Sequence, residues 1–265
     1  MAKIFIDAGH NHSGWNTGAV GNDMREQDIT WEVAFLLSEI LKNDFDTRLS
    51  RPTLEINLGQ DNNSAINARW QMSNEWGADY FISIHVNAAS GTGAETFFYD
   101  RTAQGFAETV QRIYSQEMGL RSRRTELAPQ FGVIRETLCP AILIELAFID
   151  SPLHNPDVDI LRYKRLEMAQ AIANGVYSYM GMAQSNKSEQ KPEPQRLTLS
   201  STNISYRGNR HQIQAANVDG SFVAPLSEIA KIFGGSPIGV RAALELAGYS
   251  VSWESETHTI VITDA

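Results

Sequence analysis

Four polar residues stand at positions of the sequence where they could support metal-assisted chemistry. His10 follows the first apolar segment of the chain, and His85 lies near the end of a second one. Glu145 interrupts the apolar run 140–149, and Glu26 opens the first long helical pattern. An ionised carboxylate in a setting as apolar as that of Glu145 is unfavourable unless it is paired, protonated or close to a metal ion.

Each of these residues also has a simpler structural explanation when it is taken alone. A single histidine at a strand end is more often a hydrogen-bonded structural residue than a ligand, and the charge of Glu26 suits a helix N-terminus. Glu145 fits a buried ion pair as well as a functional carboxylate. Taken together, two imidazoles, one carboxylate and a water would complete a tetrahedral zinc site with one open position. Because the residues are far apart in sequence, their spacing leaves both readings open.

The elements that must position these residues alternate between strand-like and helix-like patterns. Strands are predicted at 3–8, 47–51, 79–86, 96–99 and 140–149, and helices at 28–43, 64–76, 102–118 and 163–179. This alternation predicts an α/β fold with a mainly parallel sheet and helices on both faces. Functional sites in such sheets lie beyond the carboxyl ends of the strands, so the polar residues at the strand ends are expected to converge there.

A polar stretch divides the chain into two parts. Residues 183–195 contain no large apolar residue and include a Pro-x-Pro segment. This composition predicts a linker over 182–196 between a catalytic domain, 1–181, and a small α+β module, 197–265. In the module, helices are predicted at 225–232 and 239–247, and a hairpin is predicted from 249–253 and 259–263.

The charge balance argues against two classes of partner. The chain has 265 residues, with 22 Lys plus Arg against 31 Asp plus Glu, and its formal net charge is -9. An acidic chain lacks the electrostatic footprint of a nucleic-acid-binding protein. The same balance argues against simple electrostatic adhesion to an anionic membrane or wall.

The single cysteine and the first residues of the chain add further expectations. Cys139 alone can form neither an intrachain disulfide nor a cysteine-based zinc finger, and we expect it to be a packed, unreactive thiol. The apolar residues before Asp7 are too few for a signal peptide or a membrane-spanning helix. We therefore expect no membrane insertion, and a chain made in the cytoplasm that acts elsewhere only after release.

Segments throughout the first part resemble those of a known family. The strongest matches are residues 4–10 (IFIDAGH), 78–88 (ADYFISIHVNA) and 140–149 (PAILIELAFI). Shorter matches lie at 18–21, 49–51, 67–69 and Glu26. In this order, the segments look like those of zinc-dependent N-acetylmuramoyl-L-alanine amidases of the amidase-3 type, which include phage endolysins.

The resemblance implies an activity and a set of site residues. The activity is the zinc-dependent hydrolysis of the amide bond between N-acetylmuramic acid and L-alanine of peptidoglycan, by a lytic enzyme such as an endolysin or an autolysin. The family's zinc ligands fall on His10, Glu26 and His85, and its catalytic glutamate falls on Glu145. The chain departs from the family in the loop 11–16 (NHSGWN), where the family is rich in glycine.

The sequence gives weaker evidence of a functional role for the remaining histidines and for one tryptophan. We expect His12 to be a loop residue rather than an alternative ligand. We expect His154, His211 and His258 to have polar surface roles. Trp15 lies in the loop beside His10 and is a candidate for contact with substrate.

The second part resembles a small domain of cell-surface proteins that is named after the N-terminal region of copper amine oxidase. The matching residues are 218–227 (VDGSFVAPLS), 248–253 (GYSVSW) and 259–262 (TIVI). No copper is implied, because the module contains no cysteine and two histidines. The resemblance predicts that the module binds the bacterial cell wall.

Two alternative functions stay open from the sequence. One is a zinc peptidase that acts on the peptidoglycan stem peptide, and the other is a non-catalytic wall-binding protein with a structural metal. Glu145 argues against the second, because a closed structural zinc site needs a fourth protein ligand and no base.

Overall fold

The computed structural model describes residues 1–182 and the strands of the second part. The segments 183–199, 207–208, 219–220, 226–248, 255–258 and residue 265 lie outside the described residues. Two compact units make up the chain, Met1–Asn186 and Lys187–Ala265.

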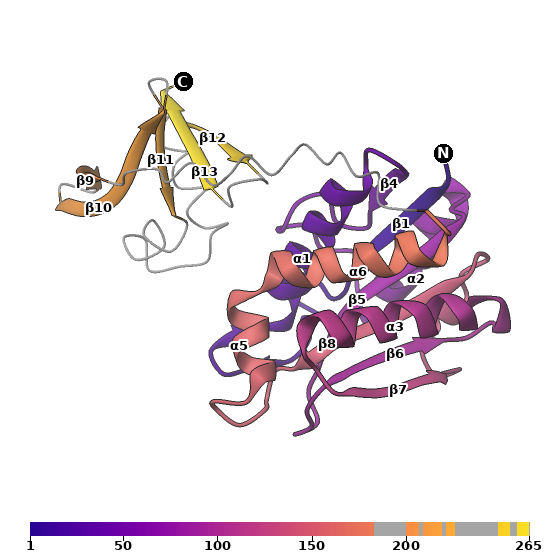
Figure 1. The fold of residues 1–265 in the computed structure, drawn as a ribbon. Coiled ribbons are helices and arrows are strands. Elements are labelled where there is room, and N and C mark those ends of the chain that lie inside the picture. Colours follow the sequence, from indigo (N-terminus) through magenta and orange to yellow (C-terminus); the bar gives the residue numbers. More distant parts are fainter. Residues whose placement is uncertain (183–199, 207–208, 219–220, 226–248, 255–258, 265) are drawn as a thin grey trace. The chain divides into compact units, whose positions relative to one another are not determined.

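A six-stranded sheet forms the centre of the first unit (Figure 1). Its strands, in spatial order, are β4 (Asp46–Leu49), β1 (Lys3–Ala8), β5 (Tyr80–Asn87), β8 (Ala141–Phe148), β6 (Ala94–Phe98) and β7 (Ser122–Leu127). Neighbouring strands are parallel except for β6 and β8, which are antiparallel. A short hairpin of β2 (Val20–Gly21) and β3 (Met24–Arg25) precedes the first helix. The predicted α/β class and mainly parallel sheet are confirmed.

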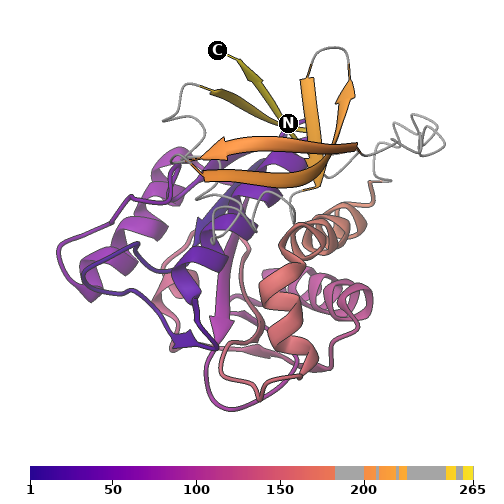
Figure 2. The ribbon, with the colours of Figure 1, turned by 90° about the vertical axis from the view of Figure 1, so that its left-hand side faces the viewer.

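Helices cover both faces of this sheet (Figure 2). They are α1 (Glu26–Leu41), α2 (Asn62–Trp76), α3 (Gln104–Met118), α4 (Gly132–Arg135), α5 (Pro156–Tyr163) and α6 (Arg165–Tyr179), with a 3₁₀ turn η1 (Arg101–Ala103) before α3. Helix α6 packs against both α1 and α3, whereas α2 contacts α4. Helix α2 is held at its start by Asp61, whose side chain accepts a hydrogen bond from Ser64 in a capping box.

One face of the sheet is apolar where its central strands begin and polar where they end. Phe5, Phe81 and Leu143 belong to one buried cluster, against which side chains of α2 pack. Because side chains alternate between the two faces of a strand, His85 and Glu145 share this face with Phe81 and Leu143. The apolar residues form the core under α2, and the polar ones lie beyond it, toward the carboxyl ends of β5 and β8.

Strand β7 and helix α5 were not predicted from the sequence. The region 119–131 carried no predicted element, yet Ser122–Leu127 forms strand β7 at the edge of the sheet. Its sequence, SRRTEL, has no apolar alternation because an edge strand with one exposed side can be polar. The helix predicted at 163–179 is confirmed as α6, which begins at Arg165, whereas the helix α5 before it carried no prediction.

The second unit contains a five-stranded antiparallel sheet. Its strands, in spatial order, are β12 (Tyr249–Glu254), β13 (Thr259–Asp264), β11 (Ser221–Pro225), β10 (Asn209–Val218) and β9 (Ser200–Tyr206). The pairing of β12 with β13 confirms the predicted hairpin. Strands β9 and β10 carried no prediction, and the helices predicted at 225–232 and 239–247 lie outside the described residues, apart from Pro225 at the end of β11.

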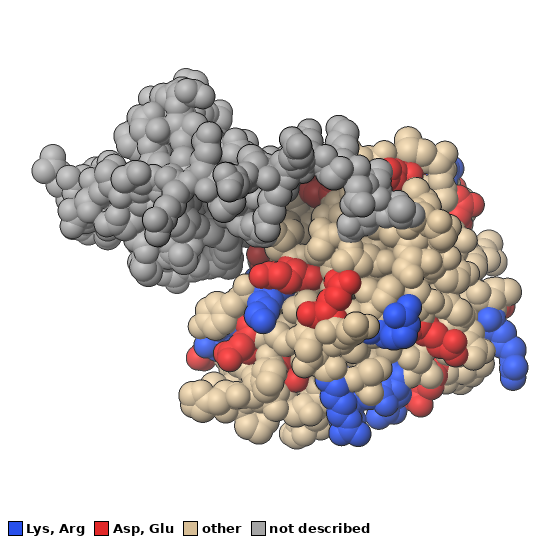
Figure 3. Space-filling view, in the orientation of Figure 1, with Lys and Arg blue, Asp and Glu red and all other residues tan. Residues whose placement is uncertain are grey.

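The surface of the first unit carries charges of both signs. On the face shown in Figure 3, Lys and Arg side chains are interspersed with Asp and Glu rather than gathered in a patch of one sign. Cys139 packs against the buried cluster below α2, and burial raises the pKa of its thiol to about 11. No helix among the described residues is long and apolar enough to cross a membrane.

Candidate metal centre

Three of the residues singled out from the sequence meet at one point of the first unit. His10 lies in the loop after β1, Glu26 is the first residue of α1, and His85 lies near the end of β5. His10 Nε2 is 3.0 Å from Glu26 Oε1, and His85 Nδ1 is 3.2 Å from the same oxygen. One ligand atom from each of the three lies within 4.8 Å of the others. The predicted convergence is confirmed, with one correction: β1 ends at Ala8, so His10 is presented by the loop rather than by the strand.

Two glycines leave the space in which these side chains meet. A Cβ at Gly9 would lie 2.5 Å from the carbonyl oxygen of Ile84 and 2.7 Å from the ring of His85. A Cβ at Gly18, whose φ is +79°, would lie 2.7 Å from Glu26 Oε2 and 2.8 Å from the ring of His10. These distances are shorter than those that Cβ atoms keep from neighbouring atoms, so both positions require glycine.

Two buried arginines hold the backbone that presents His10. The guanidinium of Arg69 donates hydrogen bonds to the carbonyl oxygens of Ala8 and His10, each at 2.5 Å. The guanidinium of Arg51 donates to the carbonyl oxygens of Ala8 and Gly9, each at 3.3 Å. His10 has a φ of 66°, a left-handed conformation that is unfavourable for a residue with a side chain. The surrounding hydrogen bonds hold it there.

Arg69 is also the partner of a buried carboxylate. Its Nη1 donates to Asp7 Oδ1 at 2.5 Å, and the Ser83 hydroxyl donates to Asp7 Oδ2 at 2.7 Å. Burial opposes the charged form of Asp7, but Arg69 and the hydroxyls of Ser50 and Ser83 hold its pKa below the ordinary value. The pair therefore stabilises the fold at neutral pH.

Replacing Arg69 by methionine is expected to lower the free energy of unfolding by ~3–5 kcal/mol, because Asp7 is left as an unpaired buried charge. Urea unfolding of the full chain measures the change. The pKa of Asp7 is depressed in the folded state, so the contribution of the pair is present above the unfolded pKa and fades as the pH falls below ~4. Adding Asp7→Asn to Arg69→Met should recover part of the loss; a double variant no more stable than Arg69→Met would contradict this account.

Glu26 is fixed in its charged form. Its Oε2 accepts a hydrogen bond from the backbone N–H of Ala19 at 2.8 Å, and its Oε1 accepts one from the N–H of Val86 at 2.9 Å. Burial raises the pKa of this carboxyl, but hydrogen bonds and charge interactions with His10 and His85 outweigh it and hold the pKa well below its usual range. Burial also lowers the pKa of His85, which favours the neutral imidazole that binds metals.

Glu145 lies beside this cluster, in register with it. In the pairing of β5 with β8, Glu145 is the direct partner of His85. Its Oε2 is buried and has no hydrogen-bond partner within the described part of the chain. Burial raises the pKa of Glu145 well above its ordinary value, and the charges of Glu26 and Glu95 add to this effect. Glu145 Oε2 is therefore a hydrogen-bond acceptor without a partner in the described part of the chain, next to the three converging side chains.

Glu95 extends the same row of side chains across the sheet, and no role was predicted for it. It is the register partner of Glu145 on β6, and its carboxylate accepts hydrogen bonds from Asn87 Nδ2 at 2.9 Å and Arg123 Nε at 2.7 Å. A bulge in β7 opposite Glu95 brings Arg124 to it as well, with Nε at 3.0 Å. Glu95 is thus fully paired, unlike Glu145.

The donor set of the cluster fits a zinc ion. Imidazole nitrogens and a carboxylate oxygen are ligands that Zn²⁺ prefers, and three protein ligands leave a fourth position open, as in catalytic zinc sites. Among the residues that the structure describes, His10, Glu26 and His85 are the group of such side chains close enough together to hold a metal ion. No hydrogen-bond donor among the described residues occupies the Oε2 atom of Glu145, so this oxygen is free to accept a proton from a water.

The other residues considered from the sequence do not join the cluster. His12 lies in the loop 11–16, as expected, and its carbonyl oxygen accepts a hydrogen bond from Arg25. His154 is exposed, and His211 lies in β10. His258 lies outside the described residues. Trp15 is 46% exposed, and its contact with substrate stays a prediction.

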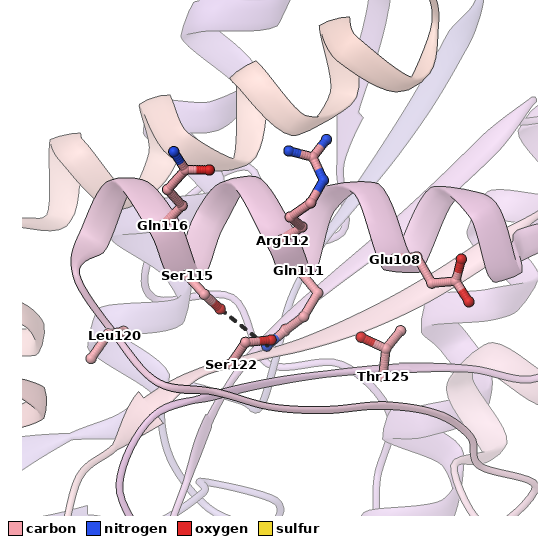
Figure 4. Close-up of a pocket in the computed structure, with 8 residues that line it drawn as sticks. All are labelled: Glu108, Gln111, Arg112, Ser115, Gln116, Leu120, Ser122 and Thr125. Carbon is pink, nitrogen blue, oxygen red and sulfur yellow. Dashed lines mark hydrogen bonds between the residues drawn. The ribbon is translucent and has the colours of Figure 1, made fainter.

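A separate groove lies between α3 and β7 (Figure 4). Apart from Leu120 it is lined by polar side chains, and Gln111 donates hydrogen bonds to the hydroxyls of Ser115 and Ser122, each at 3.1 Å. None of the four predicted site residues lines it. We assign it no chemistry.

Fold and site together define an α/β protein with a His-Glu-His site of the kind that holds a catalytic metal. The chain belongs to the N-acetylmuramoyl-L-alanine amidase family, whose Amidase_3 model matches residues 4–178. Over 178 residues it is 34% identical to the sporulation-specific N-acetylmuramoyl-L-alanine amidase of Bacillus subtilis (strain 168), an alignment that covers 66% of this chain and 65% of that protein. Over 161 residues it is 30% identical to the endolysin of Bacillus phage SPP1, covering 57% of this chain and 56% of the endolysin.

A solved structure has the same fold. The catalytic domain of CwlV, an N-acetylmuramoyl-L-alanine amidase from Bacillus (Paenibacillus) polymyxa var. colistinus, matches with a TM-score of 0.60 and 26% identity. The match covers 69% of this chain and 100% of that domain. The similarity thus lies in the first unit, and the chain spans 65% and 56% of the lengths of the two curated relatives.

Proposed function

We propose that this chain hydrolyses the amide bond between N-acetylmuramic acid and L-alanine in peptidoglycan, with a zinc ion held by His10, Glu26 and His85. The observation that carries the proposal is the convergence of these three side chains beside Glu145, in a chain that belongs to the amidase family. An N-acetylmuramoyl-L-alanine amidase and an endolysin among the relatives support a lytic role at the bacterial cell wall.

A zinc ion at such a site acts as a Lewis acid, which lowers the pKa of a bound water and stabilises negative charge on a carbonyl oxygen. Glu145 takes a proton from the attacking water through its unpartnered Oε2 and then delivers it to the departing amine of L-alanine. A cation held by the neighbouring residues favours the carboxylate form of Glu145, which otherwise has a raised pKa. Glu26 contributes a fixed negative charge, and the histidines contribute neutral nitrogen ligands.

Analysis of the new amino termini in digested wall tests the proposed bond. We expect purified peptidoglycan treated with the full chain to release new N-terminal alanine. A zinc peptidase acting within the stem peptide would instead expose the amino group of a later residue. A non-catalytic wall-binding protein would sediment with the wall without reducing its turbidity. Either of these results would overturn the proposed activity.

We also propose that the chain works as a catalytic domain, 1–181, joined by a linker, 182–196, to a wall-binding module, 197–265. The fragment 1–181 carries all six strands of the main sheet and every proposed site residue, so we expect it to fold by itself, to bind zinc and to act on soluble muropeptides. The fragment 197–265 is expected to sediment with intact wall at low and moderate salt. Because acidic residues outnumber basic ones in this module, we expect specific contacts rather than charge attraction to hold it there.

The proposed catalytic domain and the proposed wall-binding module can each be contradicted by a separate result. If the fragment 1–181 is insoluble or free of metal while the full chain is not, the catalytic domain does not end at the proposed boundary. If the fragment 197–265 stays in the supernatant at both salt concentrations, the module is a spacer or an assembly domain instead.

A further inference from the structure

Asn16 lies against the ring nitrogen of His10 that points away from the proposed metal. Asn16 Oδ1 is 3.0 Å from His10 Nδ1. The other ring nitrogen, Nε2, is 3.0 Å from the Oε1 atom of Glu26, another of the proposed ligands. The imidazole is therefore contacted at both nitrogens, by a carboxylate on the side of the site and by an amide on the outer side.

The side-chain carbonyl of Asn16 favours one tautomer of His10. A neutral imidazole carries its proton on one nitrogen and can offer a lone pair from the other. An acceptor at Nδ1 keeps a proton on that nitrogen, so Nε2 is the nitrogen whose lone pair would bind the proposed zinc. A hydrogen bond of this kind from the outer nitrogen also fixes the rotation of the ring.

Asn16 is itself held in place by the loop 11–16. Its backbone carbonyl oxygen accepts a hydrogen bond from the N–H of Asn11 at 2.7 Å. The side chain of Asn11 exchanges hydrogen bonds with the backbone of Leu58, at 3.0 Å and 2.9 Å, and accepts one from Arg69 at 3.2 Å. The φ of Asn16 is 56°, a left-handed conformation that asparagine adopts more readily than most residues. The acceptor is thus built into an ordered loop.

We propose that Asn16 is a positioning residue of the metal centre, which holds His10 in the tautomer and orientation that bind the ion. This inference rests on the proposed zinc site and identifies Asn16 as a residue that raises the affinity of that site for zinc. It also gives a role to the loop in which this chain departs from the glycine-rich sequence that it resembles.

Zinc affinity of the full chain, measured by competition with a chromogenic chelator, tests the proposal. Asn16→Gly removes the acceptor without strain, because glycine accepts a φ of 56°. We expect it to weaken zinc binding by ~10–100-fold, the usual effect of losing an outer-shell partner. Asn16→Asp keeps an acceptor oxygen at the same place, and we expect its affinity to equal or exceed that of the wild type.

Asn57→Gly is the matched control. Asn57 pins the same loop by accepting a hydrogen bond from the N–H of Ser13 at 3.0 Å and donating one to its hydroxyl at 3.0 Å, but it makes no contact with His10 that the structure shows. We expect this variant to bind zinc like the wild type. Thermal unfolding of the metal-free proteins, with similar midpoints for all three variants, shows that a loss of affinity is not a loss of folding.

Several results would overturn the inference. Equal zinc affinity in Asn16→Gly and the wild type would show that the contact does not support the site. An equal loss in Asn57→Gly, or in Asn16→Asp, would assign the effect to a loosened loop instead of the acceptor. A wild-type chain that binds no zinc would overturn the proposed metal centre itself, and this inference with it.

Discussion

Glu145→Gln is expected to retain zinc and to lower the turnover of peptidoglycan by ~10²–10⁴-fold, the range for loss of a general base. Glutamine keeps the shape of the half-buried Glu145 side chain on β8 but cannot take a proton from a water. Glu145 is not one of the three proposed zinc ligands, so its substitution should leave the ion bound to His10, Glu26 and His85. Metal analysis and rates of wall lysis on the same purified sample measure both effects.

Glu136→Gln serves as the matched control for this substitution. Glu136 follows α4, is exposed and pairs with Arg135, and it belongs to no part of the site. It should keep both zinc and turnover at the wild-type values. The role assigned to Glu145 is wrong if Glu145→Gln loses its zinc, or if it keeps wild-type turnover with zinc bound.

His85→Ala is expected to lose zinc and activity together. The substitution removes one of three proposed ligands, and it leaves Glu26 without one of its two imidazole partners. We expect zinc affinity to fall by more than ~100-fold, beyond the effect of losing an outer-shell partner. Chelator competition measures the affinity, and release of N-terminal alanine measures the activity.

His154→Asn is the control for the loss of a histidine. His154 is exposed and has a φ of 73°, a conformation that asparagine tolerates. It should bind zinc as the wild type does. A His85→Ala variant that binds zinc as tightly as this control would remove His85 from the ligand set.

The sequence predicts the strands that carry His85 and Glu145 because their residues are mostly apolar. The two polar residues stand out because they interrupt these apolar runs. It does not predict that the two are direct partners, because the register of β5 against β8 depends on contacts between segments far apart in the chain. Strand β7 was missed for a different reason. An exposed edge strand need not bury apolar side chains, so its residues lack the alternation that marks a strand.

The residues that support the site were harder to find than the ligands. Arg51 and Arg69 matched the family resemblance, but only the structure shows that both guanidinium groups are buried against the backbone that presents His10. Asn16 and Glu95 gave no signal, because a polar residue in a loop or beside a turn is ordinary in any sequence. Only the structure shows that Asn16 contacts His10 and that Glu95 is the register partner of Glu145.

The most direct test of the account is a titration of the metal-free full chain with zinc while the release of N-terminal alanine from purified peptidoglycan is followed. If His10, Glu26 and His85 hold one catalytic ion, the metal-free chain is inactive and the rate rises in proportion to added zinc up to a break at about one equivalent. Alanine release that is undiminished without zinc, or zinc binding at one equivalent without alanine release, would contradict it.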